Sequence, residues 1–132
     1  MFTRYSIPPI ARKAFLWLIM TLLSAQAFAQ KDKLVQQAEQ TMLNATKFMV
    51  ENVSTNGGYV WYYLPDLSRR WGEMEAYKTM IWIQDGGTVS VGHMLLDAYH
   101  VTGNEYYYQA AEKAAAALIW GQSNEGGWNY LI

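Results

Sequence analysis

The chain has 132 residues, with 10 basic side chains, 11 acidic side chains and no cysteine. Disulfides and thiolate metal sites are therefore excluded. The formal net charge of −1 and the lack of a basic run argue against nucleic acid as a partner, because that binding depends on neutralising phosphates with Lys and Arg. The 6 Trp, 10 Tyr and 4 Phe residues need a large core, which suggests that part of the packing surface lies outside this sequence.

The first 29 residues have the pattern of a secretory signal peptide. Arg4, Arg12 and Lys13 form a basic region, residues 14–23 are apolar, and an Ala-Phe-Ala motif ends at Ala29. The apolar run is shorter than the roughly 20 residues that cross a bilayer. We therefore expect cleavage after Ala29, export to the periplasm or the extracellular space, and no stable membrane insertion afterwards. A retained membrane anchor is the alternative.

The mature chain begins with a predicted helix from Lys33 to Val53, in which apolar residues fall on one face. Turn-forming residues and glycines at 54–58 end it. Two runs rich in aromatic and β-branched residues follow, at 59–63 and 79–83. They predict two strands of a small β-hairpin closed over residues 65–77, or else an extended loop packed on helices.

Two further helices are predicted from Val89 to Val101 and from Glu105 to Trp120. Gly103 suits the left-handed residue that follows a helix, and Asn104 can cap the next one.

A glycine–aromatic motif occurs twice after helical segments. Gly57-Gly58 precedes Tyr-Val-Trp-Tyr, and Gly126-Gly127 precedes Trp-Asn-Tyr, at an offset of 126 − 57 = 69 residues. A helical unit that recurs in this way is typical of repeat architectures, in which one unit alone cannot bury its apolar face. Because the second copy is followed only by apolar residues, we expect the chain to be the front of a longer protein.

The second half of the chain resembles the helical hairpins of α/α-toroid carbohydrate enzymes, and especially secreted pectic acid or pectate lyase-like proteins. The resemblance rests on residues 88–93 (TVSVGH), 95–99 (LLDAY), 102–107 (TGNEYY), 110–111 (AA) and 122–128 (QSNEGGW). It implies a mainly α fold in which residues 30–132 form the first repeats of an incomplete toroid, truncated at the C-terminus.

The same resemblance implies a function on uronate-rich, acidic polysaccharides, by β-elimination in the full-length form. It leaves open a toroid hydrolase of unsaturated uronate oligosaccharides, or a non-catalytic glycan-binding module, because this hairpin serves many activities. The arginine and calcium ligands of such lyases have no recognisable counterpart here. No cofactor or metal site is therefore predicted in this segment, and calcium is left for the full-length protein.

The strongest candidate for binding acidic sugars is the segment around Arg69, Arg70 and Trp71. Paired arginines can bind carboxylates through two parallel hydrogen bonds, and a tryptophan can stack on a sugar ring. The competing interpretation, which the sequence favours slightly, is that both arginines pair with Asp66, Glu73 or Glu75 on a surface loop.

Two weaker candidates complete the predicted site. His93 and Asp97 are four residues apart and share one helix face, so they could form an oriented general base, although a packing role is the more frequent explanation of such a pair. Trp61 and Trp128 each follow a Gly-Gly pair and are the tryptophans most expected to form exposed sugar platforms.

Overall fold

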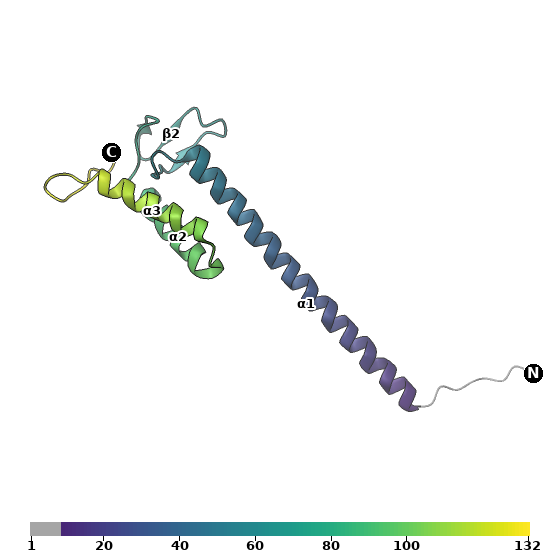
Figure 1. Ribbon diagram of the computed structural model, residues 1–132. Coiled ribbons are helices and arrows are strands. Elements are labelled where there is room, and N and C mark those ends of the chain that lie inside the picture. Colours follow the sequence, from purple (N-terminus) through teal and green to yellow (C-terminus); the bar gives the residue numbers. More distant parts are fainter. Residues whose placement is uncertain (1–8) are drawn as a thin grey trace, which may run out of the picture. The chain divides into compact units, whose positions relative to one another are not determined.

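The computed structural model describes the backbone of residues 9–132, and the side chains of residue 30 onward together with Trp17 and Met20. The chain forms two packing units, Met1–Thr41 and Met42–Ile132. The described part is mainly helical, as predicted, with three α-helices and a small antiparallel sheet (Figure 1).

The described part of the first unit is helical throughout. Helix α1 spans Pro9–Phe48, and its last turns belong to the second unit. It starts well before the predicted Lys33, because no glycine or proline interrupts residues 10–48. The cleavage point predicted after Ala29 lies within this helix. Arg4 and the side chains of Arg12, Lys13 and residues 27–29 are outside the described residues. Among the described residues, no helix is both long and apolar enough to cross a membrane.

The second unit continues α1 with a short π-helix, Met49–Val53, that ends where it was predicted to end. The three strands that follow are β1 (Tyr62–Tyr63), β2 (Arg70–Trp71) and β3 (Glu75–Ala76). They pair antiparallel in the order β1-β2-β3.

The predicted hairpin between residues 59–63 and 79–83 is thus wrong in its second strand. The reason is a tight turn right after β1, where the Asp66 carboxylate accepts hydrogen bonds from the backbone N–H (3.1 Å) and hydroxyl (2.7 Å) of Ser68. Leu67, inside this turn, has a φ of 58°. The turn brings residue 70 opposite residue 63, so that β2 occupies the place expected for 79–83.

Residues 79–83 pair instead with the end of the described chain. The Ile81 N–H donates to the Ile132 carbonyl (2.7 Å), the Ile132 N–H donates back to Ile81 (3.1 Å), and Ile83 donates to Tyr130 (2.8 Å). One bond to the first run remains, from the Trp82 N–H to the Tyr59 carbonyl (2.9 Å).

Helices α2 (Thr88–Thr102) and α3 (Glu105–Trp120) form a helical hairpin and lie side by side (Figure 1). Gly103 has a φ of 67°, and the Asn104 side chain accepts a hydrogen bond from the Tyr106 N–H (3.0 Å), so both predicted caps are confirmed. α3 has the predicted bounds, and its buried alanines form one stripe, Ala110, Ala111, Ala114 and Ala117.

Two hydrophobic clusters hold the second unit together. The first lies between α2 and α3, with Leu95 and Tyr107 at its centre. Leu43 of α1 and Val50 of the π-helix pack against it. The second lies under the sheet, around Trp82, which is only 1% exposed.

The two copies of the glycine motif differ sharply in packing. Gly57 lies against the backbone of α3, and Tyr59 after it is 2% exposed. In the second copy, Gly126 has no atom closer than 4.0 Å to the position of an added Cβ, and Trp128 is 44% exposed. Only the first copy is covered by a helical hairpin within the described chain.

Candidate functional site

The small sheet presents two faces of different character. Because side chains alternate along a strand, residues that are paired across the sheet share a face. Tyr62, Trp71 and Glu75 are paired across β1, β2 and β3 and form the outer face. Tyr63, Arg70 and Ala76 form the inner face, and they are the more buried set.

The outer face combines aromatic rings with a cation. The Arg69 guanidinium lies 5.0 Å from the centre of the Trp71 ring, within the range of a cation–π contact. Its Nε and Nη2 donate to the two Glu75 carboxylate oxygens at 2.7 and 2.8 Å. Tyr62 is 66% exposed beside them. The outer face thus places an exposed tyrosine and a half-buried tryptophan beside a cation that is already paired.

The Arg69–Glu75 pair shifts both titrations. The Arg69 hydrogen bond lowers the pKa of the Glu75 carboxyl below its ordinary value, and Glu75 raises the pKa of the Arg69 guanidinium. Both groups are well exposed, so the pair fixes geometry more than it stabilises the fold.

Arg70 lies on the opposite face and is only 6% exposed. Its Nη1 donates to the Thr55 hydroxyl (2.9 Å), and its guanidinium lies 5.3 Å from the centre of the Tyr63 ring. Burial raises the pKa of the Tyr63 hydroxyl, which accepts a hydrogen bond from the Val60 N–H (2.7 Å). The two neighbouring arginines thus diverge. They cannot act as a paired fork on one carboxylate, and only Arg69 has the acidic partner of the surface-loop interpretation.

A hollow of about 270 Å³ lies beside these arginines. We call it the arginine hollow, and it is lined by Ser68, Arg69, Arg70, Glu75, Ala76, Tyr77 and Lys78. Three of the lining side chains are cations and one is an anion.

His93 and Asp97 are both exposed on α2, and no hydrogen bond joins them among the described residues. His93 borders a different, mostly apolar hollow between α2 and α3, where its neighbours include Gly92, Leu96 and Ala111. The structure therefore brings neither residue to the arginine hollow.

The two predicted tryptophan platforms fare differently. Trp61 is half-buried, with its ring centre 5.2 Å from that of Trp82 and its Nε1 buried without a partner. It packs the core and is not an exposed platform. Trp128 is exposed, although its indole Nε1 donates to the Leu118 carbonyl (2.7 Å), which fixes the ring.

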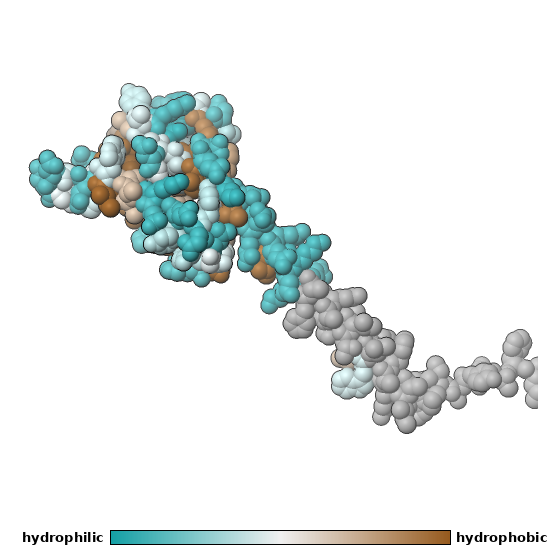
Figure 2. Space-filling model, viewed as in Figure 1, coloured by the Kyte–Doolittle hydropathy of each residue, from teal (hydrophilic) through white to brown (hydrophobic). Residues whose placement is uncertain are grey.

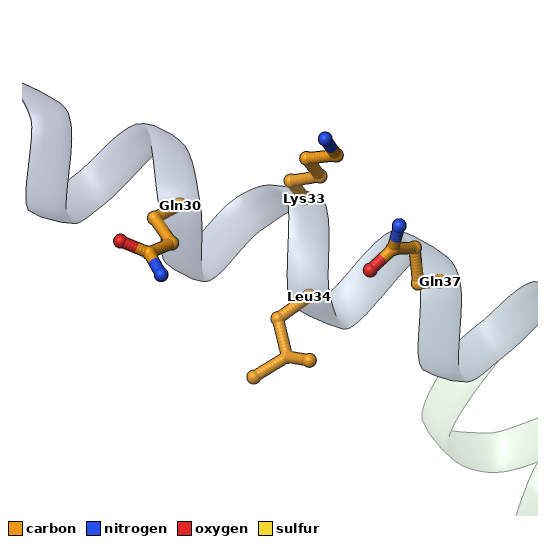
Figure 3. Close-up of a pocket in the computed structure, with 4 residues that line it drawn as sticks. All are labelled: Gln30, Lys33, Leu34 and Gln37. Carbon is orange, nitrogen blue, oxygen red and sulfur yellow. The ribbon is translucent and has the colours of Figure 1, made fainter.

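Other parts of the surface offer less. Figure 2 shows a mainly hydrophilic visible face with separate hydrophobic patches. A hollow along α1 is lined by Gln30, Lys33, Leu34 and Gln37, which project from a single helix in different directions and converge on no common point (Figure 3). Among the described side chains, no group of three or more His, Asp and Glu residues could hold a metal ion.

Sequence reasoning missed Tyr62, Thr55 and Lys78 as members of this region. The signal for Tyr62 was available in principle, because alternation along Tyr62–Tyr63 places one ring on each face. Lys78 and Thr55 are brought in by the turns around the sheet, which no local pattern specifies.

No family model matches the chain, and no curated protein or solved structure matches it either.

Proposed function

We propose that the protein binds uronate-rich, acidic glycans through the outer face of the sheet, as part of a polysaccharide-active, pectate lyase-like protein. The observation that carries this proposal is the juxtaposition of the exposed Tyr62, the half-buried Trp71 and the Arg69 guanidinium on the outer face. Uronate chains present apolar C–H faces that stack on aromatic rings, together with a carboxylate on each sugar. An arginine beside a tryptophan complements both features.

Glu75 plays a defined part in this proposal. It occupies the Nε and Nη2 edge of Arg69, which is the edge that a uronate carboxylate would use. A bound carboxylate must therefore displace Glu75 or share the guanidinium with it. Glu75 holds the arginine in place and also weakens binding by competing for it.

Glycan binding and catalysis of β-elimination are separate parts of this proposal. β-Elimination in the full-length form stays a proposal drawn from the resemblance, and it needs a base and cations that stabilise the enolate-like charge. His93 and Asp97 are the candidates for the base, and calcium is the candidate for the cation. β-Elimination produces an unsaturated uronate, whose formation can be monitored by its absorbance. Measuring that absorbance with and without a chelator tests the step.

The binding test is electrophoretic retention in gels that contain polygalacturonate or a neutral glucan. We expect Trp71→Ala and Arg69→Met each to bind polygalacturonate about tenfold more weakly, and so to be retained less in the acidic gel. Glu75→Gln should be retained more. Trp120→Ala removes an equally large, exposed ring from α3 and is the matched control. Equal retention of the native protein in both gels, or an unchanged Trp71→Ala variant, would refute the proposal.

Export is proposed on the pattern of residues 1–29. The intact mass of the exported polypeptide should correspond to a chain that begins at Gln30. A mass that retains the first 29 residues would favour the membrane-anchor alternative.

A further inference from the structure

Arg70 is a buried cation that has no counter-ion within the described part of the chain. Its side chain is 6% exposed, and no carboxylate of the described residues pairs with it. Its side-chain hydrogen bond goes to a neutral hydroxyl, that of Thr55, and its Nε is buried without a partner. Burying a charge in this way is costly unless the charge is paired and its hydrogen bonds are satisfied.

The two arginines show what is missing. Arg69 places its Nε and Nη2 on the two oxygens of one carboxylate, which is the usual side-on arrangement. Arg70 uses Nη1 for Thr55, and its Nε, the atom with which Arg69 holds Glu75, has no hydrogen-bond partner among the described residues. Arg70 therefore has a buried hydrogen-bond donor of the kind that holds a carboxylate on Arg69, but no oxyanion of the described residues accepts from it.

The surroundings of Arg70 favour an anion. The arginine hollow is lined by Arg69, Arg70 and Lys78, and its one lining carboxylate, Glu75, is already bound to Arg69. Thr55 in turn donates to the Lys78 carbonyl (2.7 Å), which connects the Arg70 partner to the wall of the hollow. At about 270 Å³ the hollow has room for an oxyanion and its water.

We propose that the arginine hollow is a binding site for a single oxyanion, held by Arg70 and Lys78. The shared chemistry is a planar or tetrahedral group with at least two acceptor oxygens, either the carboxylate of a sugar acid or free phosphate or sulfate. This site does not depend on stacking at Tyr62 and Trp71, so it stands even if the outer face binds no glycan.

The first experiment uses the native chain and needs no variant. Thermal unfolding is followed during titration with sulfate, phosphate and monomeric galacturonate, each against chloride at the same ionic strength. A ligand that binds only the folded state raises the midpoint in a saturable way. We expect such a rise, with backbone amide shifts confined to residues 68–70 and 76–78 in a parallel NMR titration.

The arms of the titration identify the source of the oxyanion. A rise with galacturonate alone assigns the site to a sugar carboxylate, and a rise with phosphate or sulfate alone assigns it to an inorganic ion. A rise with all three supports a general oxyanion site. Equal midpoints in every anion at matched ionic strength would overturn the proposal.

Variants test the residue assignment. Arg70→Lys keeps the charge but loses the side-on edge, and we expect about tenfold weaker anion binding. Lys31→Met removes an exposed cation of α1 that does not line the hollow, and this charge control should retain binding. Undiminished binding by Arg70→Lys would refute the role of Arg70. Loss of polymer retention by Trp71→Ala with anion binding intact would separate this site from the proposed glycan surface.

Discussion

Gly57 occupies a position that only glycine fits, for two reasons. Its φ of +88° is in the region that favours glycine, and a Cβ added there would clash with the Lys113 carbonyl oxygen of α3. Gly126, at the corresponding place in the second copy of the motif, has nearly the same φ of +84°, but no atom comes closer than 4.0 Å. A comparison of the two positions therefore separates the cost of a left-handed backbone conformation from the cost of a steric clash.

The comparison of Gly57→Ala with Gly126→Ala should measure that contact. Both variants incur the cost of a left-handed alanine, about 1–2 kcal/mol. Gly57→Ala also forces a clash with a packed helix, which adds about 1–3 kcal/mol. Denaturant unfolding of the full chain should show Gly57→Ala to be the less stable variant by that margin. Equal losses would mean that the turn and α3 are not packed as described.

The arginines show where reasoning from residue types stops. The sequence correctly drew attention to Arg69, Arg70 and Trp71 as a cluster. Whether neighbouring side chains act together depends on the local backbone, and in a strand they point to opposite faces. Once β2 is known, Arg69 belongs with Glu75 on the outer face, and Arg70 becomes a buried cation.

At the scale of elements, prediction worked best where local signals agreed. The α2–α3 hairpin was predicted within a residue or so, because periodic apolar residues, Gly103 and Asn104 all indicate the same boundaries. The hairpin partner at 79–83 was mispredicted because strand composition says nothing about which strand pairs with which. The turn at Asp66 and Ser68 made that choice.

The cap of α3 offers a test at this scale. The Asn104 side chain accepts from the Tyr106 N–H, so Asn104→Ala should cost about 1 kcal/mol of unfolding free energy. Asn104→Asp keeps the acceptor and adds a negative charge at the helix N-terminus, which should preserve or slightly increase stability. The measurement is equilibrium unfolding of both variants at neutral pH. A cap that contributes nothing would leave Asn104→Ala as stable as the native chain.

For the whole molecule, alkaline pH should be destabilising in a defined range. Burial raises the pKa of Tyr59 from 10.0 to about 12, with a smaller effect from Tyr63. Below pH 10 the hydroxyl is protonated in both states, and its contribution is fully present. Between pH 10 and 12 the unfolded chain loses this proton while the folded chain keeps it, so the free energy of unfolding falls.

Tyr59→Phe isolates this contribution. The variant should lose less stability than the native chain between pH 10 and 12, as measured by denaturant unfolding at each pH. Tyr77→Phe, which removes a hydroxyl that is on a highly exposed residue, is the control and should follow the native profile. A native-like alkaline profile in Tyr59→Phe would show that Tyr59 ionises as freely in the folded chain as in the unfolded one.

The pairing of Ile81 with Ile132 has a consequence for the order of events during protein synthesis. The contacts of the α2–α3 hairpin join residues close in sequence, so they can form while the chain is still emerging from the ribosome. The backbone partners of Ile81 and Ile83 arrive only with residues 130–132. Until then, the segment that carries Trp82 has an open edge, and a nascent chain stalled before residue 130 should be more exposed to proteases and chaperones there than in the helical hairpin that follows.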